Sequence, residues 1–168
     1  SGGGIGAWIV GPKYPDLFSA LVPRAGIPPR AEDVIENLNG LPIFMIHGKG
    51  DPTIGVEHSR KIAAKMKKLG IDHTYREMSG GHEFFQKLNK DVVRWIKRKS
   101  RRLRRRFRYY GSASGDPRII HWLQLTGRGK VTVKGRIIKR RRIILTVDHP
   151  ERLKGLDIWL SRKIFDMR

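Results

Sequence analysis

The chain has 168 residues, 39% of them hydrophobic and 30% charged, and its 36 Lys and Arg against 15 Asp and Glu give a formal net charge of +21 at pH 7. This length and apolar content allow one ordinary domain or two small ones, and favour a packed core over disorder. The chain contains no cysteine, which excludes disulfides, thiolate metal sites and a cysteine nucleophile. No apolar run approaches the roughly 20 residues that a membrane-spanning helix needs, so no membrane span is expected.

Residues 1–98 alternate between helical patterns and short apolar runs. In chain order they predict a helix from just after Ser1 to about Lys13, a strand over 18–22, a loop over 24–41, a strand over 42–47, a helix over 56–69, a strand over 73–78 and a helix over 82–98. The apolar side of the helix over 56–69 comprises Ile62, Ala63, Met66 and Leu69. Strands that alternate with helices predict an α/β fold with a parallel sheet of about three strands and flanking helices.

A strongly basic run follows this block. Residues 97–108 have nine Lys or Arg in twelve positions, and because like charges at helical spacing repel, we expect a linker over 99–108. The remaining residues, 109–168, alternate apolar and polar positions with period two, which predicts a small domain of four or five antiparallel strands. Its first apolar set, expected to face one side, is Ile119, His121, Leu123 and Leu125.

The positive charge is concentrated in the C-terminal part. Residues 1–98 contain 15 Lys and Arg and 10 Asp and Glu, a net charge of +5, whereas residues 99–168 contain 21 and 5, a net charge of +16. Such a field favours association with polyanions such as nucleic acid, anionic lipid or acidic polysaccharide, but it does not identify the fold.

Three residues of the types that form a catalytic triad occur in a particular order. Ser1 heads a glycine run, Asp51 follows residues 47–50, His-Gly-Lys-Gly, and His82 follows Gly80 and Gly81. Nucleophile, acid and base in this order, each placed after a strand, are typical of α/β-hydrolases. The order carries more weight than any one of the residues.

Longer segments strengthen this resemblance. Residues 14–23, from Tyr-Pro-Asp to Val-Pro, resemble the segment after the nucleophile helix in esterases and prolyl-oligopeptidase-type serine peptidases. Residues 41–48 with Asp51 and residues 56–60 are similar to the strand, acid loop and following helix of the same group. The tail over 122–166 resembles a small β extension of some bacterial members. The chain is therefore identified as similar to an α/β-hydrolase-type serine hydrolase.

The resemblance implies a role for each residue of the motif. Ser1 would be the nucleophile, His82 the general base and Asp51 the residue that orients the imidazole, while the N–H of Gly2 would donate to the oxyanion. The implied reaction is hydrolysis of an ester or peptide substrate through an acyl-enzyme. The resemblance also favours a secreted or periplasmic location.

One departure from the family pattern limits this interpretation. The family motif is Gly-x-Ser-x-Gly, and this sequence begins at the serine. We therefore expect a C-terminal fragment of a hydrolase whose partner is the missing N-terminal half of the same domain. Because that half supplies the second oxyanion-hole amide, the isolated fragment is expected to be inactive.

Each candidate residue also has a structural alternative. Residues 1–4 could be a flexible linker, or Ser1 could act with its own α-amine as base; Asp51 could be an Asp-Pro turn residue; and His82 could be an exposed histidine at a helix start. Asp72 is the second candidate for the acid. With no second histidine or carboxylate at ligand spacing, we expect neither a metal nor a cofactor.

A noncatalytic alternative rests on the basic clusters. The chain could be a basic module that binds nucleic acid or another polyanion nonspecifically through Arg101, Arg102, Arg104, Arg105, Arg106, Arg140, Arg141 and Arg142. Alternatively, these residues could form a solvated linker and a hairpin turn.

Overall fold

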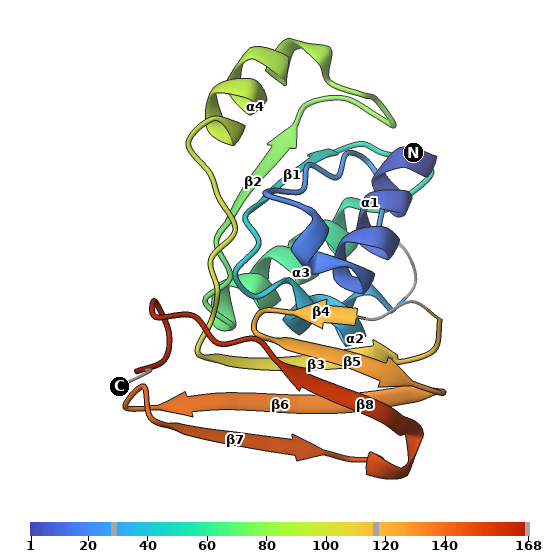
Figure 1. The fold of residues 1–168 in the computed structure, drawn as a ribbon. Helices are drawn as coiled ribbons and strands as arrows, with labels where there is room; N and C mark the ends of the chain where they lie inside the picture. Colours follow the sequence, from blue (N-terminus) through green and yellow to red (C-terminus); the bar gives the residue numbers. More distant parts are fainter. Residues whose placement is uncertain (28–29, 116–117, 167–168) are drawn as a thin grey trace.

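The computed structural model describes residues 1–27, 30–115 and 118–166 (Figure 1). Its helices are α1 Gly2–Lys13, α2 Ala31–Val34, α3 Val56–Lys68 and α4 Asn89–Ile96, with short 3₁₀ turns η1 Pro15–Leu17, η2 Ile35–Leu38, η3 Gln86–Leu88 and η4 Pro150–Arg152. Its strands are β1 Ile43–Gly48, β2 His73–Met78, β3 Arg106–Ser112, β4 Arg118–Ile120, β5 Leu123–Gly127, β6 Lys130–Ile138, β7 Arg142–Val147 and β8 Leu153–Ile158. The architecture is mixed α/β, with one parallel pair of strands and two antiparallel sheets.

The parallel pair is formed by β1 and β2, which are in register from Ile43 opposite His73 to Gly48 opposite Met78. Every residue of β1 is buried, as expected for an apolar run in a parallel sheet. Because both strands run in the same direction, the loops that follow them emerge at the same edge of the sheet.

The predicted third parallel strand over 18–22 is wrong in this structure. The chain instead lies along β1 through two isolated bridges, Leu21 to Ile43 and Arg24 to Ile46. Between them, Pro23 accepts a hydrogen bond from Ile46 but has no N–H with which to donate to the next carbonyl of β1. A continuous ladder therefore cannot form, and the parallel sheet has two strands rather than about three.

Two helical predictions need correction at their ends. The predicted loop over 24–41 contains α2 and η2, and the predicted helix over 82–98 begins only at Asn89. Phe85 explains the second difference, since its backbone is left-handed, with φ of 54°, and its ring is buried beside Phe44 and Val92. Burying that ring turns the chain before α4 starts. Helices α1 and α3 lie where they were expected, although Leu69 on the predicted apolar side is exposed.

The C-terminal part forms two three-stranded antiparallel sheets, β3-β6-β7 and β4-β5-β8, rather than four or five strands. The expected side assignment at 119–125 is wrong. The chain turns at His121, which has a φ of 58°, so that Ile120 is buried and Ile119 is 38% exposed. A two-residue turn between β4 and β5 shifts the alternation by one position, and Leu123 and Leu125 share the core with Ile120.

The sheets pack against the α/β part on the side away from α4 (Figure 1). Asn37 in η2 is buried at this contact: its side-chain amide donates to the carbonyl oxygens of Pro12 and Tyr110, and its oxygen accepts from the Tyr110 N–H at 2.9 Å. Residues 99–105 connect the two parts without a helix or strand, and β3 begins within the segment predicted as linker. The predicted division into 1–98, 99–108 and 109–168 stays a prediction.

No helix in the described ranges has both the length and the apolar character that crossing a membrane requires.

Replacing Asn37 should destabilise the fold through its contact with β3. Asn37→Ala leaves the Pro12 carbonyl and both main-chain groups of Tyr110 without their partner, so we expect a loss of about 2–4 kcal/mol in the free energy of unfolding. Urea unfolding measures it. Asn39→Ala is the matched control, expected to change that energy by less than about 0.5 kcal/mol. Equal effects of the two substitutions would show that the Asn37 contact does not stabilise the fold.

Candidate active site

Asp51 and His82 lie in the loops that follow β1 and β2. These loops are joined by two main-chain hydrogen bonds, from Lys49 N–H to the Met78 carbonyl at 2.7 Å and from Gly50 N–H to the Gly80 carbonyl at 2.9 Å. A Cβ at Gly48 would overlap the Gly81 carbonyl, so glycine is required for this close approach. The two loops are therefore held together at one edge of the sheet.

The Asp51 carboxylate is completely buried and fully hydrogen-bonded. Oδ1 accepts from the N–H groups of Thr53 and Ile54 at 2.8 and 2.9 Å, and Oδ2 lies 2.8 Å from Nδ1 of His82. Burial by itself raises the pKa of Asp51, but the Ile54 and Thr53 N–H groups and the His82 imidazole together outweigh it and hold the pKa below its usual value. The carboxylate is thus ionised at neutral pH.

A second histidine, His47, contacts the Asp51 carboxylate from within the protein interior. His47 is buried, with Nε2 3.2 Å from Asp51 Oδ2 and 2.9 Å from the Ile54 carbonyl, and with Nδ1 2.6 Å from the Ser59 hydroxyl. These contacts fit a ring that accepts from Ser59 and donates from Nε2. His47 therefore holds Asp51 and the turn after it in place.

His82 lies on the outer side of the buried Asp51 and His47 side chains. Its side chain is 28% exposed, and when Nδ1–H donates to Asp51, the lone pair of Nε2 points away from the carboxylate. Within the described ranges Nε2 makes no hydrogen bond. This is the arrangement in which an imidazole accepts a proton from a hydroxyl group.

Ser1 is the N-cap of α1. Its hydroxyl accepts from the Gly4 N–H at 3.2 Å and lies 3.3 Å from the Arg24 carbonyl, to which it donates. In the part of the chain that the structure describes, no hydrogen bond joins Ser1 to His82. Gly2 is the first residue of α1, so its N–H has no acceptor within the helix.

Arg24 connects Ser1 to the loop that carries His82, and the sequence analysis did not identify it. Its carbonyl accepts from Ser1, while its guanidinium donates to the Phe84 carbonyl at 2.7 Å and lies over the Phe84 ring, 4.3 Å from the centroid. Burial lowers the pKa of Arg24. A charged residue directly after the apolar residues 20–23 was the one available signal in the sequence. Arg24 thus connects the start of α1 to the loop that carries His82.

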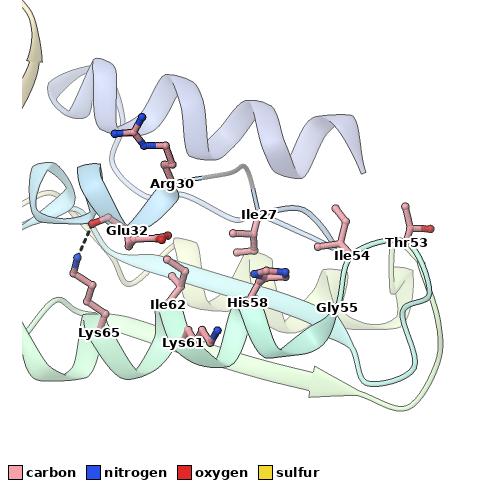
Figure 2. Close-up of a pocket in the computed structure, with 10 residues that line it drawn as sticks. All are labelled: Ile27, Arg30, Glu32, Thr53, Ile54, Gly55, His58, Lys61, Ile62 and Lys65. Atoms are coloured by element: carbon pink, nitrogen blue, oxygen red, sulfur yellow. Dashed lines mark hydrogen bonds between the residues drawn. The ribbon is translucent and has the colours of Figure 1, made fainter.

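A pocket of about 600 Å³ borders the acid loop (Figure 2). Ile27, Ile54 and Ile62 give it apolar walls, and its polar lining residues are Arg30, Glu32, Thr53, His58, Lys61 and Lys65. Lys65 is tied to the Glu32 carbonyl at 2.6 Å. The pocket starts two residues after Asp51, but its lining includes none of Ser1, Asp51 and His82.

The other candidates from the sequence lie elsewhere. Asp72, the second candidate acid, precedes β2 at the opposite edge from His82 and pairs with Lys99 at 2.8 Å.

In the basic tail, Arg141 pairs with Asp166 and Arg140 donates to the Arg162 carbonyl. Arg104, Arg105 and Arg106 line a separate groove, whose lining does not include Arg101, Arg102 or Arg142. Among residues 1–27, 30–115 and 118–166, no group of three His, Asp or Glu side chains could hold a metal ion.

Comparison with known proteins gives partial matches. No family model matches the chain. It is 34% identical over 92 residues to "Protein usf" of Aquifex pyrophilus, a match that covers 54% of this chain and 39% of that protein. Two solved structures are similar: a thermostable esterase, with a TM-score of 0.51 and 27% identity over 60% of this chain and 30% of the esterase, and esterase PE8, with a TM-score of 0.49 and 24% identity over 56% and 45%.

The likeness to the thermostable esterase supports an esterase-like, hydrolase-type α/β fold for about 60% of the chain. The chain spans less than half the length of each of these three proteins.

The ionised state of Asp51 should stabilise the fold in a defined pH range. Because its pKa in the folded protein lies below the unfolded value of about 4, its contribution is fully present above pH 4 and is lost as the pH falls through the folded pKa. Asp51→Asn should therefore lower the free energy of unfolding near pH 7 by about 1–3 kcal/mol, and this difference should shrink below pH 4. Urea unfolding between pH 7 and pH 2.5 measures it. The exposed Asp91→Asn is the control, and a difference that does not change with pH would contradict the expectation.

Removing the Arg24 guanidinium should loosen the loop that carries His82. Arg24→Met keeps the apolar stem but leaves the Phe84 carbonyl without its charged donor, a loss of about 1.5–3 kcal/mol, so amide hydrogen exchange around Phe84 and Phe85 should accelerate by about tenfold or more. Exchange monitored by mass spectrometry measures it. Arg30→Met, at an exposed guanidinium, should leave that loop unchanged. Unchanged protection in Arg24→Met would remove Arg24 from this role.

Proposed function

We propose that this chain carries the Ser-Asp-His residues of a serine hydrolase that cleaves esters, or peptide bonds, through an acyl-enzyme. The observation that carries the proposal is the 2.8 Å hydrogen bond between buried Asp51 and the Nδ1 of His82, made at the edge where two parallel strands end. It leaves Nε2 facing outward as a base. The esterase-like fold, which covers about 60% of the chain, supports this assignment.

Each residue has a chemical task in this mechanism. His82 Nε2 removes the proton from the Ser1 hydroxyl as the oxygen attacks the substrate carbonyl, and Asp51 stabilises the imidazolium that forms. The Gly2 N–H, at the positive end of α1, donates to the developing oxyanion. His82 then protonates the leaving alkoxide or amine. Water attacks the acyl-enzyme by the same route in reverse and restores Ser1.

Ser1 must change its hydrogen bonding for this reaction. Its hydroxyl is bound to the Arg24 carbonyl and has to turn toward Nε2 of His82. Catalytic hydrogen bonds often form fully only when substrate is bound. Arg24 holds Ser1 through its main-chain carbonyl and the loop around residue 84 through its guanidinium, which limits how far apart the two groups can move.

The short interval between Ser1 and Asp51 favours a site that is open to large substrates. Ser1 and Asp51 are 50 positions apart, and α1, η1, α2, η2 and β1 lie in that interval. The interval therefore has no room for a large lid, and this side of the site suits bulky or polymeric esters, peptides and acylated carbohydrates.

Activity-based labelling tests the proposal. A fluorophosphonate probe should label the full-length protein in which this sequence occurs, and Ser1→Ala or His82→Ala should abolish labelling and reduce ester hydrolysis by about 10⁴-fold or more. The exposed Ser100→Ala is the matched control and should label normally. Labelling that persists in Ser1→Ala, at some other serine, would refute the assignment.

A further inference from the structure

A groove of about 900 Å³ lies between the α/β part and the sheet β3-β6-β7. One wall is the exposed face of β3 and β6, and the other includes Asn39 and the end of α3 at 68–70. Seven basic side chains line it, and we call it the basic groove: Lys68, Arg104, Arg105, Arg106, Arg108, Lys134 and Arg136. Among the described lining residues the one acid is Glu36, which lies 3.6 Å from Arg108.

The basic groove is at the opposite end of the parallel strands from the candidate catalytic residues. Asn39 and Gly70 precede β1 and β2, whereas Asp51 and His82 follow them. Six residues of strand correspond to about 20 Å. A ligand in the basic groove is therefore independent of the acyl-transfer chemistry proposed above.

The strand register places cations of β3 directly opposite cations of β6, an arrangement that we call the cation grid. Arg106 lies directly opposite Arg136, and Arg108 lies directly opposite Lys134, all on the exposed face of the sheet. Like charges directly opposite each other destabilise a sheet. Only the Glu36 contact offsets this repulsion within the described lining. A bound polyanion would offset the rest of it.

We propose that the basic groove binds the phosphodiester backbone of a nucleic-acid strand without reading its bases. Five of the seven cations are arginines, whose planar guanidinium matches two phosphate oxygens at once. Cations two residues apart on one strand face are about 7 Å apart, so the grid offers a regular row of charge to a polymer with one anion per repeat.

The shape and lining of the basic groove favour this ligand. Phe107, the one aromatic residue of the lining as described, is buried on the other face of β3, so the groove offers no ring for base stacking. Contacts are then with phosphates, which give affinity without sequence preference. Two opposed walls suit a linear strand better than a planar bilayer.

Fluorescence anisotropy with a labelled single strand of about 16 nucleotides tests the proposal. Arg106→Gln/Arg136→Gln should weaken binding by about tenfold or more and make the slope of log affinity against log salt shallower by about 1.4, about 0.7 for each lost phosphate contact. The control Arg98→Gln/Arg128→Gln removes the same charge from exposed positions outside the groove and should weaken binding less than about threefold. Oligothymidine and a mixed sequence should bind equally.

Folding of the variants is checked separately. Because Arg106→Gln/Arg136→Gln removes a like-charge pair, its melting temperature should not fall below that of the unchanged protein. A second double variant, Lys68→Gln/Lys134→Gln, changes one residue in each wall of the basic groove. It should weaken oligonucleotide binding about as much as Arg106→Gln/Arg136→Gln does.

Three results would overturn the proposal. One is an equal loss of oligonucleotide affinity in the groove and control variants, which would indicate that net charge alone determines binding. Another is a strong preference between the two base sequences. The third is tighter binding of polygalacturonate or of phosphatidylserine vesicles than of the oligonucleotide, since these present carboxylate or lipid anions. Loss of probe labelling in Ser1→Ala bears only on the hydrolase proposal.

Discussion

The parallel register of β1 and β2 is the constraint on which the candidate site depends. Six paired positions bring the ends of both strands to one edge, and the main-chain bonds from Lys49 and Gly50 then join the two following loops. Asp51 and His82 are 31 positions apart in sequence but share this edge. A shift of one residue between the strands would separate the carboxylate from the imidazole. Burial of β1 on all sides makes such a shift unfavourable.

Around that edge, buried polar groups act as supports. Asp51 accepts two main-chain bonds and contacts two histidines, and His47 is bonded in turn to Ser59. A buried carboxylate with all its partners is stable, whereas the loss of one partner leaves a desolvated charge. Arg24 extends the same principle to the other side of the site, where its main-chain carbonyl accepts from the Ser1 hydroxyl and its guanidinium donates to the Phe84 carbonyl. These groups hold Asp51 and the two loops beside it in place.

The C-terminal sheets combine a conventional core with an unusual surface. Val131, Val133 and Tyr109 pack on the inner face with Trp122, while the outer face carries the cation grid of the basic groove. Net charge alone would predict only diffuse polyanion affinity. Strand pairing concentrates the positive charge in one place, because the register of β3 and β6 sets residues near 106 and 136 side by side. The hairpin arginines at 140 and 141, by contrast, are engaged with the chain end at 162 and 166.

The sequence by itself determined the local features: the positions of α1, α3, β1 and β2, and the order of serine, aspartate and histidine. These follow from periodicity and from glycine and proline at element ends, which are properties of neighbouring residues. Only the tertiary structure decided that Asp51 bonds His82, that Arg24 connects the start of α1 to the loop of His82, that Pro23 interrupts a third strand and that the turn at His121 reverses the expected sides of Ile119 and Ile120. Each of these depends on register or on contacts between distant segments, because the free energy of such contacts belongs to the packed pair and not to either local sequence.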